Sequence, residues 1–219
     1  MEQLISYFET IPSWHRSLIL VGGITFFWIL EGIVPLFNVP YKKWRHSVPN
    51  FFFTITTIIV NFPLAFLLLK SSDWAVANDF GIINWLPEMP LWLYVVLGVM
   101  FLDLIGAYTA HWVEHKVKPL WMVHLVHHSD HNVDTTTANR HHPLESFIRY
   151  FFTLVGVLVV GAPIGIIMLY QSLSVVFSQF NHANIRLPRK VDNALSWIIV
   201  SPDMHKVHHH YQLPYTDSN

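Results

Sequence analysis

Residues 91–115 read LWLYVVLGVMFLDLIGAYTAHWVEH. The first twenty of them are almost all apolar, which is enough for a helix to cross a hydrocarbon layer of about 30 Å. The stretch ends in His111 and His115, which are four residues apart and would share one face of a continuing helix. Neutral imidazole is the commonest nitrogen ligand of transition metals. This stretch therefore predicts a membrane-spanning helix that carries metal ligands at one end.

Composition places the rest of the chain in a membrane as well. Of its 219 residues, 53% are hydrophobic and only 12% are charged, and the mean hydropathy is +0.38, far from the balance of a soluble domain. The apolar stretches run from about Leu18 to Phe37, Phe51 to Leu69, Leu91 to Ala110 and Phe147 to Phe180. The sequence predicts an all-α fold, a multi-pass transmembrane helical bundle.

The fourth apolar stretch is interrupted by Gly161, Pro163 and Gly165. Its 34 residues are few for two full spans, and glycine and proline can break a helix at that point. We expect a hairpin of two short or tilted helices that enters and leaves by the same face. The expected bundle thus has about three full spans plus a broken re-entrant or hairpin segment.

Basic residues predict the orientation of the bundle. Lys42, Lys43 and Arg45 lie between the first two apolar stretches, whereas the next loop is acidic. Basic loops stay on the cytoplasmic side. The third span returns to this side, so we expect an integral membrane protein with a cytoplasmic, histidine-rich cap that holds the metal site.

Eight histidines fall in three short boxes at spacings typical of metal ligands. In a helical His-x-x-His-His box, we expect the first two imidazoles to share a face and the third, turned by about 100°, to reach a neighbouring ion. Eight nitrogens are too many for one metal and suit two. The boxes are His111 and His115 (HWVEH), His124, His127 and His128 (HLVHH), and His205, His208 and His209 (HKVHH).

Asp103 is an ionisable residue inside the third span, and such residues are functional candidates. Ideal α-helical geometry places it within about 80° of His111. It could accept a hydrogen bond from a ligand N–H, or it could be hydrated near the interface or bonded to Tyr108. Glu31 and His46 carry no motif, and we expect them in helix packing, at the interface or in a loop.

The residues that connect the boxes resemble the fatty acid hydroxylase and sterol desaturase superfamily. The resemblance rests on HLVHHSDHNVDTTTANRHHPLE at 124–145, QFNHANI at 179–185 and SPDMHKVHHH at 201–210, followed by DSN. It covers about residues 103–219. We therefore divide the chain into N-terminal transmembrane helices at 1–100 and a histidine-box catalytic domain at 101–219. The family's pattern continues beyond Asn219, so we expect a fragment or a C-terminally truncated enzyme.

This resemblance implies a membrane-bound di-iron oxygenase that hydroxylates or desaturates a lipid C–H bond with O₂. The lipid would be a fatty acyl, sterol or related molecule. The resemblance implies that Arg140 and Glu145 bind and orient the centre from outside the ligand set, and that His142 either joins them or is itself a ligand. His131, His141 and His210 fall outside the pattern. The implied metal ligands are His111, His115, His124, His127, His128, His182, His205, His208 and His209.

Electrons for such a reaction must come from another molecule. The chain has no cysteine for an iron–sulfur or haem-thiolate site, and no glycine-rich dinucleotide motif follows a strand. A reductase, ferredoxin, cytochrome b5 or reduced pterin would have to dock on the basic face. We expect no nucleic-acid partner.

Two alternatives belong to other functional classes. HWVEH fits the His-x-x-Glu-His motif of zinc-dependent membrane peptidases, with Glu114 as the general base, but that leaves six box histidines without a role. A non-catalytic metal transporter would need ligands distributed along the spans as a path. The boxes instead lie beyond the end of one span and around a hairpin.

Overall fold

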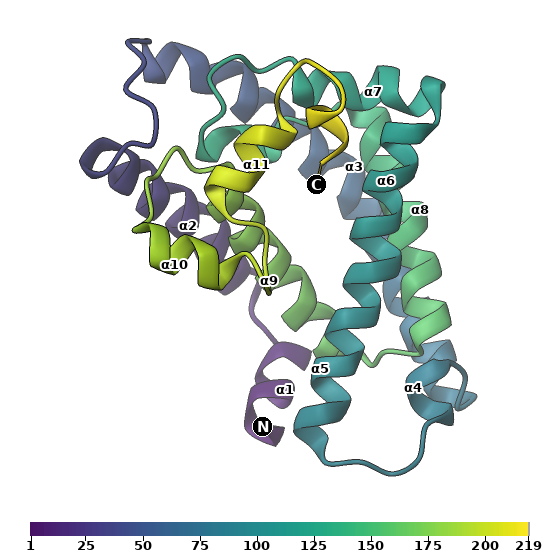
Figure 1. Ribbon diagram of the computed structural model, residues 1–219. Coiled ribbons are helices and arrows are strands. Elements are labelled where there is room, and N and C mark those ends of the chain that lie inside the picture. Colours follow the sequence, from purple (N-terminus) through teal and green to yellow (C-terminus); the bar gives the residue numbers. More distant parts are fainter. Residues whose placement is uncertain (219) are drawn as a thin grey trace.

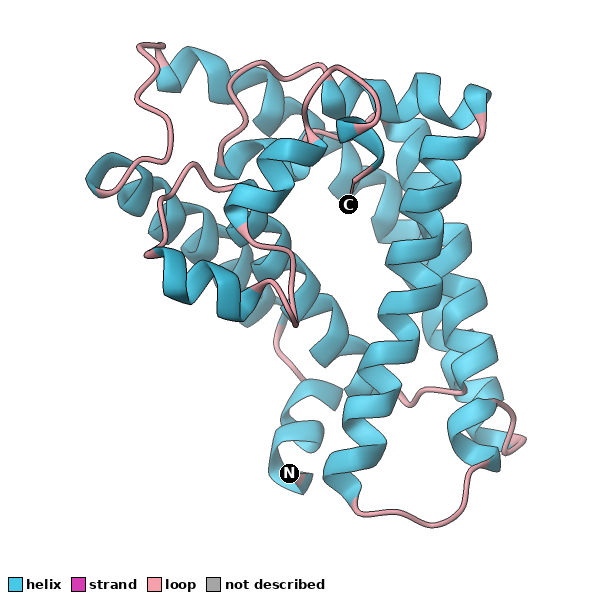
Figure 2. Ribbon diagram, viewed as in Figure 1, coloured by secondary structure: helices cyan, strands magenta, loops and turns pink. Residues whose placement is uncertain are grey.

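The structure is a computed structural model that describes residues 1–218. Every regular element in this range is helical, and Figure 2 draws helices and loops without a strand. Asn219, where the expected catalytic domain ends, lies outside the described residues. The helices are α1 (Glu2–Glu9), α2 (Ser13–Ile33), α3 (Lys43–Ala77), α4 (Ile82–Trp85), α5 (Leu91–Leu102), η1 (Asp103–Tyr108), α6 (Thr109–Lys116), α7 (Lys118–His128), η2 (Thr135–Asn139), α8 (Pro143–Val160), α9 (Ile164–His182), α10 (Arg189–Leu195), α11 (Pro202–His208) and η3 (Tyr215–Asp217).

Five helical segments are long and apolar enough to cross a membrane. The all-α transmembrane fold is confirmed, and so is the sequence of three spans followed by an interrupted segment. The 26 residues of the third segment form one continuous rod of α5, η1 and α6 (Figure 1). The five segments are Ser13–Ile33, Lys43–Trp85, Leu91–Lys116, Pro143–Val160 and Ile164–His182.

The hairpin between α8 and α9 turns where the sequence predicts. Gly161 follows α8 in the left-handed conformation with φ 75°, and Pro163 precedes the first residue of α9. The turn is locked against the end of the second span, because Ser72 Oγ donates to Ala162 O at 2.8 Å and Asn84 Nδ2 donates to Gly161 O at 3.1 Å. Consequently α8 begins and α9 ends at the same end of the bundle, where α6, α7 and α11 also lie (Figure 1).

Replacing Gly161 with alanine is expected to destabilise the bundle. The new Cβ would lie 2.1 Å from Phe80 O, and the left-handed conformation alone costs an L-residue about 1–2 kcal/mol. We expect the Tm in detergent, followed by tryptophan fluorescence, to fall by roughly 4 °C or more. Gly22→Ala is the matched control, because nothing lies within 4 Å of that position and alanine favours a helix. Equal Tm values for the two variants would contradict this packing.

The cap consists of α7, η2, α11 and the loops that join them beyond the spans. The loop around η2 is tied to α3 by buried polar contacts rather than by apolar packing. His46 places Nε2 2.7 Å from Asp130 Oδ1 and Nδ1 3.1 Å from Asp134 Oδ2. Tyr41 donates to the same Asp134 carboxylate at 2.7 Å. Although burial opposes it, these hydrogen bonds hold the pKa of Asp134 below its usual range. His46 is thus a structural tie, not an isolated interfacial residue.

Glu31 provides a second tie between the spans and the cap. Its Oε1 accepts from the backbone N–H of Thr135 at 2.7 Å and of Asn184 at 2.9 Å, and Oε2 lies 2.5 Å from Lys43 Nζ. The side chain is buried inside the bundle. A buried carboxylate is tolerated when it is paired and hydrogen-bonded in this way. Glu31 therefore fixes the first span, the η2 loop and the end of α9 relative to one another.

Candidate metal centre

The three histidine boxes and His182 lie on four helices whose ends meet at the cap. His111 and His115 are on α6, one turn apart, with ring centroids separated by 4.6 Å. The second box occupies the C-terminal half of α7, and the third begins on α11. His182 is the last residue of α9. The hairpin brings this last histidine back to the end of the bundle from which α8 departs.

Four of these histidines form group one. They are contributed by α6 and α7, and one ring nitrogen from each lies within 4.8 Å of the others. His208 adjoins this group, because its Nε2 is 3.2 Å from His111 Nε2. Group one consists of His111, His115, His124 and His128.

Group two draws on three different helices. Its ligand atoms also lie within 4.8 Å of one another. His182 Nε2 is at its middle, 3.0 Å from His127 Nε2 and 2.9 Å from His205 Nε2. The two groups are adjacent, since the rings of His128 and His209 stack at 4.5 Å. Group two consists of His127, His182, His205 and His209.

The second and third boxes are each divided between the groups in a way that differs from the expected geometry. In the second box, the first and third histidines are in group one and the middle one is in group two. In the third box, His205 and His209 are in group two, whereas His208 adjoins group one. Positions i and i+4 differ by about 40° around a helix, and positions i and i+3 by about 60°. The i, i+4 pair therefore shares a group, and the histidine between them reaches across.

The donor set fits transition metals. Both ring nitrogens of His128, and Nε2 of His115 and of His124, are buried without a hydrogen-bond partner. Burial lowers the pKa of His208 to about 3 and that of His127 and His209 well below the usual range, so these imidazoles are neutral. Uncompensated buried nitrogens would be costly. Metal ions would satisfy them, and neutral imidazole is the form that binds metal.

Glu145 supports group one from outside. Its Oε1 accepts from His124 Nδ1 at 2.9 Å, from His141 Nδ1 at 2.7 Å and from Arg149 Nε at 2.8 Å. With Nδ1 of His124 donating to the carboxylate, Nε2 carries the lone pair and faces the group. A ligand histidine is typically held in one tautomer by such an outer carboxylate.

His141 occupies the place that the sequence suggested for His142. The His141 ring stacks on His127 at 4.9 Å, and its Nε2 lies 3.0 Å from Ala138 O. His142 instead accepts from Leu144 N and caps the start of α8. Proline at position 143 starts a new helix there, which turns the second histidine of the pair away from the cap interior.

Arg140 donates to groups at the end of α7 rather than to a ligand. Its Nε donates to Val126 O at 2.9 Å and its Nη2 to Ser129 Oγ at 3.2 Å, both at the C-terminal end of α7. A cation is favourable at this end of a helix. Arg140 therefore fixes the turn that carries His127 and His128.

Glu114 is a buried partner of Arg149. Its Oε2 lies 2.9 Å from Arg149 Nη2 and 3.7 Å from His124 Nδ1. Glu114, His124 and Glu145 also approach one another within 4.8 Å, but Arg149 already bridges the two carboxylates and supplies the positive charge there. A fully buried, ion-paired carboxylate is poorly placed to activate water, which disfavours the peptidase alternative.

Asp103 is placed differently from the expectation. It opens the π-helical turn η1, and it interacts with Tyr170 of α9 rather than with His111. An α turn takes about 3.6 residues and a π turn about one more, so the eight residues from Asp103 to His111 close about two full turns. Asp103 therefore lies on the His111 face but roughly 12 Å deeper along the span, out of reach of a ligand nitrogen.

Lys206 is a contributor that the sequence reasoning missed. Its Nζ donates to the last carbonyls of α9, at 2.5 Å to His182 O and 3.1 Å to Ala183 O. Burial lowers the pKa of this amine to about 7. The contact holds α11 against α9, which brings His205 to His182. The sequence did offer one indication of this role, because Lys206 lies inside the third histidine box.

The profile of the fatty acid hydroxylase family matches residues 95–219, a range that includes all nine histidines of the centre. The chain belongs to the fatty acid hydroxylase family. Alkylglycerol monooxygenase from Xenopus tropicalis is 27% identical over 147 residues, which are 65% of this chain and 30% of that relative. No solved structure matches the chain.

Family membership confirms the resemblance to the fatty acid hydroxylase and sterol desaturase superfamily. The chain spans about 30% of the length of its alkylglycerol monooxygenase relative. The matched region begins inside α5 and contains η1, the hairpin and the whole cap. All eight box histidines and His182 converge in it.

Proposed function

We propose that the chain is a membrane-bound di-iron oxygenase that hydroxylates or desaturates a lipid C–H bond. The observation that carries this proposal is the convergence of nine imidazoles in two adjacent groups at one end of five apolar helices. The family and the alkylglycerol monooxygenase relative support a lipid as substrate. We take residues 101–219 as the catalytic domain and 1–100 as the N-terminal transmembrane helices.

Two irons bound to these histidines would use O₂ and two external electrons to oxidise the C–H bond. In hydroxylation, one oxygen atom enters the lipid and the other leaves as water with two protons. We assign His111, His115, His124, His128 and His208 to one ion and His127, His182, His205 and His209 to the other. Glu145 holds the His124 tautomer, while Arg140 and Lys206 hold the helices that carry the ligands.

Electrons would come from a separate reductase, ferredoxin, cytochrome b5 or reduced pterin. The absence of cysteine and of a dinucleotide motif supports an external donor. We place the cap on the cytoplasmic side because Lys42 and Arg45 lie beside it. A transporter is less well supported, because the histidines gather at one end of the spans and leave no path through them.

The proposal is tested by expressing the chain in a host supplied with ¹⁸O₂ and profiling its lipids by mass spectrometry. A lipid that gains one ¹⁸O atom, or two hydrogens fewer, is expected with the chain and absent with the His127→Ala, His208→Ala double variant. Immunoblotting of membrane fractions checks that both proteins accumulate equally. Identical lipid profiles at equal amounts would refute the oxygenase.

A further inference from the structure

A pocket of about 300 Å³ lies where two spans end on the cap side. The segments that directly follow α2 and α9 pair with each other there through their backbones. Leu36 N donates to Asn184 O at 3.1 Å. Arg186 N donates to Val34 O at 2.8 Å. Segments that directly follow membrane spans lie at the level of the lipid head groups. The pocket therefore lies at the membrane surface.

The pocket is lined by charges of both signs. Arg186 and Arg189 contribute two guanidinium groups, and Asp192 and Asp203 contribute two carboxylates. Among residues 1–218, none of these four side chains takes part in an ion pair. Opposite charges that line one pocket without pairing can each bind the opposite charge of a single ligand. The lining therefore matches a ligand that carries both signs.

These charged groups keep capacity for hydrogen bonds to a ligand. Oδ1 of Asp192 is buried without a hydrogen-bond partner, which is costly for a carboxylate. Arg186 donates through Nη2 to Leu36 O at 3.0 Å, and a guanidinium has five N–H donors, so most of them remain. A ligand ammonium would supply the donor that Asp192 lacks. A ligand phosphate would accept from the two guanidinium groups.

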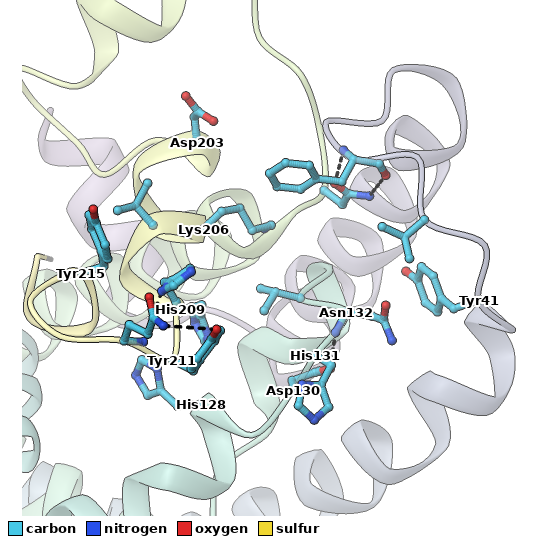
Figure 3. Close-up of a pocket in the computed structure, with 17 residues that line it drawn as sticks. Tyr41, His128, Asp130, His131, Asn132, Asp203, Lys206, His209, Tyr211 and Tyr215 are labelled. Atoms are coloured by element: carbon cyan, nitrogen blue, oxygen red, sulfur yellow. Dashed lines mark hydrogen bonds between the residues drawn. The ribbon is translucent and has the colours of Figure 1, made fainter.

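The pocket is separate from the metal centre. No histidine is among the described residues that line it. Asp203 also borders the larger cap cavity of about 760 Å³, and Figure 3 shows it across that cavity from His128, with Lys206 between them. A ligand in the smaller pocket would therefore be a bound component of the membrane and not a substrate beside the histidines.

The chain next to the pocket carries exposed apolar side chains. Trp197 is 90% exposed and Ile198 is 85% exposed, although both lie outside the five apolar segments. They follow α10, which has no buried residue and which Figure 1 shows set back from α11 toward the opposite end of the bundle. Tryptophan is enriched where membrane and water meet. A charged pocket beside such side chains matches a lipid, with its head group in the pocket and its acyl chains against the apolar side chains.

We propose that this pocket binds the head group of a bilayer phospholipid that carries both a phosphate and a primary ammonium. The phosphate binds to Arg186 and Arg189, and the ammonium binds to Asp192 and Asp203. Phosphatidylethanolamine has both groups. Phosphatidylcholine has no N–H to donate to the buried carboxylate oxygen, and phosphatidylglycerol has no positive charge. The site does not depend on the proposed oxidation chemistry.

Native mass spectrometry of the full chain in detergent tests the site with added palmitoyl-oleoyl lipids. We expect phosphatidylethanolamine to bind about tenfold more tightly than phosphatidylcholine or phosphatidylglycerol. Glycerophosphoethanolamine, which has the same head group without acyl chains, should compete at least about tenfold more weakly than the lipid. Equal affinity for the three lipids would overturn the inference. Equal competition by the chain-free head group would overturn the bilayer as its source.

Charge variants test the assignment of the two halves of the head group. Arg186→Gln with Arg189→Gln should weaken phosphatidylethanolamine binding about tenfold or more. Asp192→Asn with Asp203→Asn should reverse the preference, so that phosphatidylglycerol binds more tightly than phosphatidylethanolamine. This ratio is measured within one variant, so loss of folded protein cannot imitate it. Undiminished binding in the first variant, or an unreversed preference in the second, would contradict the site.

The matched control for these variants removes two cations outside the pocket. Lys118→Gln with Lys190→Gln changes exposed side chains that do not line it. Lipid affinity and preference should stay as they are in the unchanged chain. A tenfold loss in this control would show that general surface charge, and not the pocket, attracts the lipid.

Spin labels test the position of the segment, because the chain has no cysteine of its own. A label at Ile198→Cys in nanodiscs of phosphatidylethanolamine and phosphatidylcholine should be relaxed more by O₂ than by a water-soluble nickel complex. Phe62→Cys, 82% exposed in the second span, is the lipid reference, and Tyr211→Cys, 86% exposed in the cap, is the aqueous reference. Nickel access at 198 equal to that at 211 would place the segment in water and overturn the inference. Low access of both reagents would overturn it as well, because a second copy of the chain would then cover the segment in place of lipid.

Discussion

Changing His205 and His209 together to alanine is expected to remove one of two metal ions and to abolish lipid oxidation. The pair supplies half of group two but no member of group one. Changes in residues that only support a ligand lower metal affinity or activity by about 10–100-fold. Removal of two ligands should therefore lower both by more than about 100-fold. Metal content by inductively coupled plasma mass spectrometry and ¹⁸O₂ incorporation measure the two effects.

The controls for this prediction come from the same chain. His111→Ala with His115→Ala removes half of group one and should also leave about one ion per chain. His210→Ala removes the histidine that directly follows the third box but belongs to neither group, so metal content should not change. The prediction is that each histidine group binds its own ion. A double variant that remains folded and keeps both ions, or loses both, would contradict it.

Replacing Glu145 with alanine should be the most damaging change outside the ligand set. The carboxylate is fully buried and accepts from His124, His141 and Arg149. Its removal leaves Arg149 with one buried partner instead of two, and loss of one member of a buried ionic network costs about 3–5 kcal/mol. We expect the Tm to fall by roughly 6–20 °C and metal affinity to fall by about 10–100-fold.

Glu145→Gln separates the two roles of this side chain. The amide keeps an acceptor for His124 but loses the charge that pairs with Arg149, so metal affinity should recover more than stability does. Glu88→Gln, in an exposed loop, is the control and should change neither. Tm and competition with a metal chelator are the measurements. A Glu145→Ala protein with unchanged metal affinity would remove Glu145 from the support of His124.

The sequence was sufficient for the bundle, and the nine histidines that it proposes as ligands lie together in the structure. Apolar runs located the spans, and Gly161 with Pro163 located the hairpin turn, because both residues limit the backbone locally. The second box precedes the hairpin and the third follows it. Because both were expected to contribute to one centre, they were placed at the same end of the bundle. These predictions depend on local chemistry and on topology.

Other features depend on how distant segments pack, and local spacing could not predict them. No sequence pattern predicts the π turn at Asp103–Tyr108. This turn changes the rotation along the span enough to bring Asp103 onto the same face as His111. His141, and not His142, contacts Glu145, because α8 begins at Pro143 and His142 caps its first turn. The ties made by Glu31 and His46 join residues that are about 80 to 150 positions apart in the chain.

The central claim is a centre of two irons held by histidine nitrogens, and iron K-edge X-ray absorption of the iron-loaded full chain tests it most directly. We predict about two irons per chain, a first shell of light-atom ligands that includes imidazole, and a second iron within about 4 Å. A single iron per chain without iron–iron scattering, at full occupancy of the protein by metal, would contradict the account.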